Sequence, residues 1–259
     1  MFSVYHFIWL GICAALIVVG LVWLTKNKPS LERVLNLACV VAVLSEVIKT
    51  FSMLQMVPSA DGSKMFLYLQ MNHLPLHLCS LQIFFIFYVR FAKPGKLRDA
   101  VLAFMYPSCT IGAFFALIIP TIFSTSIKAA QAFTHPIGYQ FFLFHTMLIL
   151  LGLYIPMSGQ VELRPKHYLT TLEILGVVAF ASIYLNSLVA SPIYQNGKLL
   201  SVEYSPNFFF TYRTPIGIKL TEMWHWYVYI AILLMLALAL IAVFYIPVFL
   251  KAKRNQAEK

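Results

Sequence analysis

Apolar residues run through this chain in long stretches, separated by shorter segments that hold most of the charges. The stretches cover about residues 4–25, 34–56, 74–92, 99–123, 137–157, 169–190 and 224–250. A helix needs roughly 20 predominantly apolar residues to cross the hydrocarbon core of a bilayer. The pattern therefore predicts an all-α fold, a polytopic membrane bundle of seven transmembrane helices, forming a single domain over residues 1–259.

Composition supports a membrane protein and argues against a soluble one. Hydrophobic residues make up 61% of the chain and charged residues 11%, which is more apolar surface than a soluble domain of this size can cover. The first stretch is long enough to span a bilayer and lacks a small-residue cleavage site, so we expect it to remain as a span rather than act as a removable signal peptide.

The basic residues predict an orientation. Thirteen of the nineteen Lys and Arg residues lie between the first and second, third and fourth, or fifth and sixth stretches, in the C-terminal tail, or, for Arg90, at the end of the third stretch. Because basic residues concentrate on the cytoplasmic side, we expect the N-terminus outside and the C-terminus in the cytoplasm. This asymmetry accounts for the net charge of +10, and no cluster of basic residues suggests a nucleic-acid partner.

With that topology, polar residues from five spans fall in the outer half of the membrane. Ionisable and reactive side chains are costly at membrane depth, so they are rare there and face a protein interior or a cavity. Residues with a purely structural role would scatter in depth, whereas these cluster and so predict a site. The clustered residues are Glu46, Lys49, Cys79, His145, Asn186 and His225.

Helical phase suggests roles around Cys79. Pro75 suits the first turn of a helix, which places Cys79 near a helix N-terminus, where a thiolate is favoured. His77 is about 200° away round the helix, whereas Gln82, three residues on, shares the face of Cys79. A base for the thiol should therefore come from another span. His145 is the histidine at suitable depth.

Each of these residues also has a structural explanation. A buried histidine can hydrogen-bond a neighbouring helix, and a buried cysteine can be a small core residue, as we expect for Cys13, Cys39 and Cys109. Glu46 and Lys49, three apart on one face, can neutralise each other. A pair of histidines without a nearby carboxylate makes a poor metal site, so we predict no metal and no cofactor.

Three short motifs resemble one known family. Residues 74–80 (LPLHLCS), 207–215 (NFFFTYRTP) and 224–227 (WHWY) resemble signatures of the YwaF/transmembrane protein 164 family, and His145 stands at the equivalent point of the fifth span. That family is similar to intramembrane lipid hydrolases that use a threonine and a histidine. Its animal members resemble CoA-independent acyltransferases of ether phospholipids, with a cysteine nucleophile and a histidine. The resemblance implies these roles for Cys79 and His145, and a bacterial cell membrane as the location.

Residues and resemblance together predict a lipid acyltransferase or lipid hydrolase. Cys79 would attack the ester carbonyl of a phospholipid that enters laterally, and His145 would accept the thiol proton. The acyl-thioester would then pass its chain to a lysophospholipid or to water. Gln82 or Asn186 would stabilise the oxyanion. The substrate-binding or supporting residues are Glu46, Lys49, His77, Gln82, Asn186, Asn207, Arg213 and His225.

Other functions stay open on the sequence. A transporter or small-solute binding protein could use the same cavity, with Glu46, Lys49 and the histidines as ligands. A sensor or assembly subunit would perform no chemistry there. The long segment from about residue 191 to 223 is rich in aromatic residues and predicts a lid or binding segment. Within it, Arg213 is suited to bidentate binding of a lipid phosphate.

Overall fold

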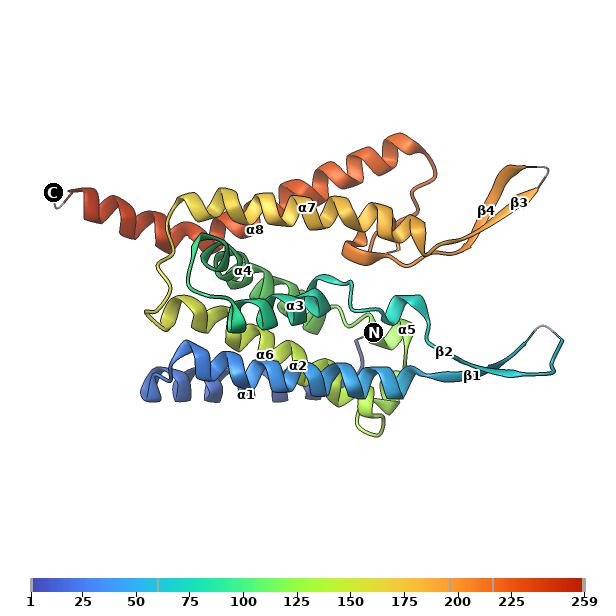
Figure 1. Ribbon diagram of the computed structural model, residues 1–259, viewed down its shortest axis with the longest axis horizontal. Helices are drawn as coiled ribbons and strands as arrows, with labels where there is room; N and C mark the ends of the chain where they lie inside the picture. The colour runs from blue at the N-terminus through green and yellow to red at the C-terminus, as the bar shows by residue number, and fades with distance from the viewer. Residues whose placement is uncertain (1, 60, 196, 216, 258–259) are drawn as a thin grey trace. The chain divides into compact units, whose positions relative to one another are not determined.

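The computed structural model describes residues 2–59, 61–195, 197–215 and 217–257 and is mostly helical (Figure 1). Within those residues, six helices are long and apolar enough to cross a membrane. They are α1 (Val4–Asn27), α2 (Leu31–Met53), α4 (Lys96–Ile118), α6 (Pro136–Met157), α7 (Lys166–Leu188) and α8 (Met223–Ala257). The prediction of a polytopic helical membrane protein is confirmed at this level.

The third predicted span is the exception. Here α3 (Leu78–Phe91) has 14 residues and rises about 21 Å, less than the roughly 30 Å of a hydrocarbon core. The preceding residues form a 3-10 helix, η1 (Met71–His73), and a turn. Pro75 therefore lies before the helix rather than in its first turn, and Cys79 is the second residue of α3.

The all-α prediction missed two antiparallel hairpins. Strand β1 (Gln55–Pro58) pairs with β2 (Met65–Tyr68), and β3 (Ser191–Gln195) pairs with β4 (Lys198–Tyr204). These strands are short and largely exposed, so they bury no core. In the sequence they lie next to the apolar spans, and nothing in their residues distinguishes them from a loop. The remaining short elements are α5 (Ile122–Thr125), η2 (Ala129–Gln131) and η3 (Phe208–Phe210).

The chain forms two compact units. The first comprises residues up to 75 together with 79–163, and the second comprises residues 76–78 together with the chain from 164 onward. In the first unit, α6 packs against α1, α2 and α4 (Figure 1). In the second unit, α7 packs against α8 and against η3.

Aromatic packing joins α1 to α6 in the first unit. The indole of Trp9 stacks on Phe133 and Phe142, with ring centroids 4.9 and 4.8 Å apart. Its Nε1–H donates to the carbonyl of Ala132 at 3.1 Å. The ring therefore buries apolar area while its one polar group stays paired, which a buried tryptophan requires.

Candidate functional site

A chain of buried hydrogen bonds joins α3 to α4. Gln82 Nε2 donates to Ser108 Oγ at 3.0 Å, and that hydroxyl donates to the carbonyl of Phe104 at 2.7 Å. On its other side, the thiol of Cys109 donates to Gln82 Oε1 at 3.2 Å. Gln82 and Cys109 are fully buried. Buried polar groups need such partners because leaving them unpaired costs free energy.

Cys79 lies at the start of α3. Because α3 begins at Leu78, the backbone N–H groups of Cys79 and Ser80 lie in the first turn, where helix geometry offers them no carbonyl four residues back. The Cys79 side chain is partly exposed, unlike those of the three other cysteines. A partly accessible thiol at a helix N-terminus is suited to nucleophilic attack.

His145 lies inside the first unit, on α6. Its side chain is 7% exposed, and its ring is 4.4 Å from that of Phe141, centroid to centroid. Nδ1 lies 2.6 Å from the carbonyl oxygen of Phe141. A carbonyl only accepts, so Nδ1 carries the hydrogen, and in the neutral ring Nε2 holds the lone pair. This tautomer leaves Nε2 as the atom that can accept a proton.

Helix α4 gives a common reference for the heights of Cys79 and His145. Both Gln82 of α3 and Gly152 of α6 lie against Cys109. At a rise of about 1.5 Å per residue, Cys79 is about 4.5 Å beyond Gln82 and His145 about 10.5 Å beyond Gly152, in the same direction. Their heights then differ by about 6 Å. Among the described residues, no hydrogen bond joins the two side chains.

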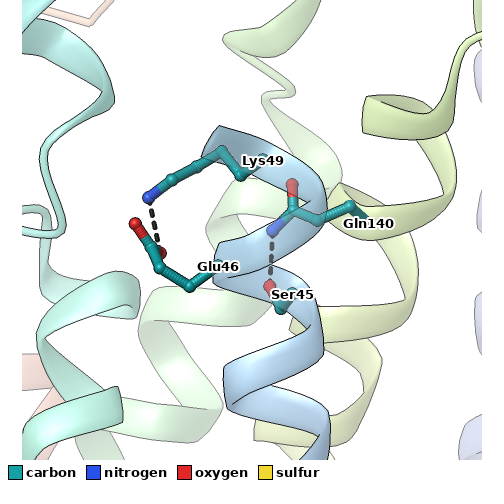
Figure 2. Close-up of polar contacts among 4 residues, drawn as sticks. All are labelled: Ser45, Glu46, Lys49 and Gln140. Carbon is teal, nitrogen blue, oxygen red and sulfur yellow. Dashed lines mark hydrogen bonds and ion pairs between the residues drawn. The ribbon is translucent and has the colours of Figure 1, made fainter. Parts of the chain in front are cut away.

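Glu46 and Lys49 form an ion pair on α2 (Figure 2). Lys49 Nζ lies 2.7 Å from Glu46 Oε2, which confirms that residues at this spacing can neutralise each other. On another side of α2, Gln140 of α6 donates to Ser45 Oγ at 2.6 Å (Figure 2). The ion pair thus extends from α2 on a different side from its polar contact with α6.

The two histidines before α3 do not share a helix. His73 ends η1, and burial, followed by the nearby Lys49 ammonium, lowers its pKa. His73 is therefore neutral at pH 7 and adds no cation beside Lys49. The ring of His77 packs edge-on against Phe208, with centroids 5.0 Å apart, inside the second unit. The searched residues contain no group of three His, Cys, Asp or Glu side chains arranged to hold a metal.

Asn186 stabilises the segment that follows β4. Its Nδ2 donates to the carbonyl of Phe208 at 3.1 Å and to Thr211 Oγ1 at 2.9 Å, while its Oδ1 accepts from the N–H of Phe208 at 2.8 Å. Both amide hydrogens are thereby donated. Asn186 has no N–H left for an oxyanion, so of the two amides that the sequence suggests for this role, the structure favours Gln82.

The remaining predicted residues lie along the same segment and the start of α8. Asn207 Oδ1 accepts from the N–H groups of Tyr212 and Arg213, each at 3.0 Å, and so closes a local turn. The exposed Arg213 donates from Nη2 to the carbonyl of Ser205 at 2.5 Å. His225 Nδ1 lies 3.2 Å from Thr221 Oγ1. These contacts give Asn207 a structural role and leave most of the Arg213 fork to solvent.

Sequence reasoning missed Ser108. It treated Cys109 as a core residue, which its burial bears out, but not as a hydrogen-bond donor. A polar residue beside a cysteine in the middle of a span was the available signal, because such side chains can hydrogen-bond a neighbouring helix.

Six candidate spans, with a buried polar cluster among them, define a polytopic α-helical membrane protein. The family model of the TMEM164 family matches residues 1–245, so the chain belongs to that family. Comparison with curated proteins gives no match, and neither does comparison with solved structures.

Proposed function

We propose that this protein is an intramembrane lipid acyltransferase or lipid hydrolase in which Cys79 forms an acyl-thioester and His145 is the base. The observation that carries the proposal is the His145 tautomer. Its Nδ1–H is held by the Phe141 carbonyl at 2.6 Å, which leaves the lone pair on Nε2, and the heights of His145 and Cys79 differ by about 6 Å. A fixed, neutral imidazole is what a thiol nucleophile requires of its base.

The proposed reaction has two steps. Cys79 Sγ attacks the ester carbonyl carbon of a phospholipid while its proton passes to His145 Nε2. The ester C–O bond then breaks, and the lysophospholipid alcohol leaves with that proton. In the second step the hydroxyl of a lysophospholipid, or water, gives its proton to Nε2 and attacks the thioester, which releases the thiol. Transferase and hydrolase differ only in the acceptor.

The negative charge of each tetrahedral intermediate needs donors. The backbone N–H groups of Cys79 and Ser80 in the first turn of α3 are suitable, since helix geometry offers them no carbonyl four residues back and helix N-termini attract negative charge. Gln82 supplies a further N–H one turn along. In this proposal α3 and the turn before it complete a seventh crossing, with the N-terminus outside and the site in the outer half of the membrane.

Turnover by the purified protein tests this proposal. Cys79→Ala and His145→Ala should each abolish release of fatty acid, or transfer of the acyl chain, from a labelled phospholipid in detergent micelles. Cys39→Ala, which removes a buried thiol of α2, is the matched control and should keep wild-type turnover. Turnover that survives in Cys79→Ala would refute the proposal.

A second candidate, transport or binding of a small polar solute, is favoured by one observation. The Glu46–Lys49 ion pair lies within an apolar helix, and ionisable groups at membrane depth often line solute pathways. Uptake of labelled solutes into proteoliposomes that depends on this pair, without any lipid turnover, would support this function.

A further inference from the structure

The buried contacts of Gln82 fix which way its amide points. Ser108 has one hydroxyl hydrogen, and it is donated to the carbonyl of Phe104 at 2.7 Å. Towards Gln82 this hydroxyl therefore accepts, so the Gln82 atom 3.0 Å from it is the donor Nε2. The oxygen Oε1 then faces Cys109, whose thiol donates to it at 3.2 Å. Both ends of the amide are thus assigned by their partners.

The reversed amide would be worse. It would draw the Ser108 hydroxyl away from the Phe104 carbonyl, and it would pair an N–H with the sulfur of Cys109, which is a weak acceptor. Gln82 and Cys109 are fully buried and Ser108 is 8% exposed, so water cannot readily compensate for a lost bond. The two partners therefore act together to hold one orientation.

One hydrogen of the Gln82 amide remains unused. Nε2 carries two hydrogens, and the described residues offer an acceptor for only one of them, at Ser108. Gln82 is three residues after Cys79, so both lie on one face of α3. Helical side chains also lean towards the helix N-terminus, which carries the amide towards the level of the thiol.

We propose that Ser108 and Cys109 are positioning residues that orient the Gln82 amide so that its free N–H meets the acyl oxygen held at Cys79. This inference rests on the proposed function and deepens it. It assigns a task to two side chains of α4 that act on the substrate only through Gln82. It also explains why a cysteine with no nucleophilic role lies opposite Gln82.

The test compares two reagents on the purified full chain. A p-nitrophenyl ester acylates a thiol through a tetrahedral oxyanion and so benefits from the amide donor. A chloroacetamide alkylates the same thiol by direct displacement and forms no oxyanion. The rates at Cys79 are read by mass spectrometry of the peptide that contains it. In the wild-type protein, both reagents should modify Cys79 faster than the other cysteines.

The substitutions should separate the two rates. Gln82→Met, which removes the donor, should slow acylation about 100-fold. Ser108→Ala and Cys109→Ala should each slow acylation about tenfold, because the amide loses one of its two hydrogen-bond partners. Cys109→Ser should keep the acylation rate within about twofold of wild type, because the serine hydroxyl still donates to Gln82 Oε1. Alkylation should stay within about twofold of wild type in every variant. Thr110→Val is the control, since Thr110 back-bonds on the same helix to Tyr106 and not to Gln82.

The other results are also decisive. Equal loss of acylation and alkylation would mean that Ser108 and Cys109 only shape the surroundings of the thiol, and unchanged acylation would mean that they do not orient the amide. Either result overturns this inference and leaves Cys79 as the nucleophile. No preferential modification of wild-type Cys79 would instead overturn the proposed function, and this inference with it. If Ser108→Ala is too unstable to purify, the Cys109→Ala and Cys109→Ser pair gives the same comparison.

Discussion

Helix α6 lies tightly against α4 at Gly152, and we predict that Gly152→Ala is destabilising. An added Cβ would lie 3.0 Å from the carbonyl oxygen of Tyr106 and 3.1 Å from the Cβ of Cys109, and it would also meet Thr110 Oγ1. The contact with Thr110 Oγ1 is the tightest of the three, so either α6 withdraws from α4 or the Thr110 hydroxyl leaves the Tyr106 carbonyl, which it now meets at 2.8 Å. Overpacking costs about 1–3 kcal/mol and a lost hydrogen bond about 1 kcal/mol.

The assay is thermal unfolding in detergent. A loss of about 2–3 kcal/mol should lower the apparent melting temperature by about 5–10 °C for a chain of this size. Gly11→Ala on α1 is the matched control, because nothing lies within 4 Å of the Cβ it would add. It should be neutral or stabilising by up to about 1 kcal/mol. Equal melting temperatures for the two variants would refute the proposed close contact between α6 and α4.

Three further predictions concern other parts of the chain. Asn186→Ala should destabilise by about 1–3 kcal/mol, because the partners of Nδ2 and Oδ1 around Phe208 and Thr211 lose their hydrogen bonds. Asn186→Asp should destabilise at least as much, because it places a carboxylate in a fully buried site facing the Phe208 carbonyl. Similar melting temperatures for both variants and wild type would contradict this. Hydrogen bonds from Ser59 and then Ser63 lower the pKa of the exposed Asp61 to about 2. The contacts at this turn should therefore be complete above pH 3.8 and lost as the pH falls through about 2. Carboxyl NMR should show that the pKa of Asp61 rises in Ser63→Ala. Trp9→Phe should keep the ring stack but leave the Ala132 carbonyl, which Nε1 meets at 3.1 Å, without its donor. The free energy of unfolding should fall by about 1 kcal/mol. An unchanged denaturation midpoint would show that this hydrogen bond does not contribute to stability.

The long helices could be predicted from the sequence because hydrophobic length alone defines a span. The expected stretch 137–157 and the observed α6, Pro136–Met157, differ by one residue at one end. The start of α3 could not be predicted in the same way. Pro75 is compatible with both the first turn of a helix and the turn before one, so local preference does not decide between them. The missed hairpins have the same origin, since two short exposed strands carry no periodic core signal.

Some residues of the candidate site could likewise be predicted from the sequence, and others could not. Cys79, His145 and Gln82 were found because polar side chains are conspicuous in apolar sequence. Ser108 was not found, since a small hydroxyl can satisfy itself on its own helix, and only the structure shows that its second contact is Gln82. Asn186 was found but its partners were not, because Phe208 and Thr211 are 22 and 25 residues away in the sequence.

The Glu46–Lys49 pair gives a prediction that also separates the two candidate functions. The Lys49 side chain is 11% exposed and that of Glu46 is 30% exposed. Glu46→Gln leaves the more buried charge without its partner and should cost up to about 3 kcal/mol, whereas Lys49→Met leaves the less buried of the two charges and should cost less. The double variant, Glu46→Gln with Lys49→Met, should melt near wild type, because no uncompensated charge remains. If both single changes cost the same, or the double variant is the least stable, the pair is not a mutual neutralisation. A stable double variant that retains lipid turnover would then exclude an obligatory role of the pair in catalysis, whereas loss of solute uptake in the same variant would favour transport.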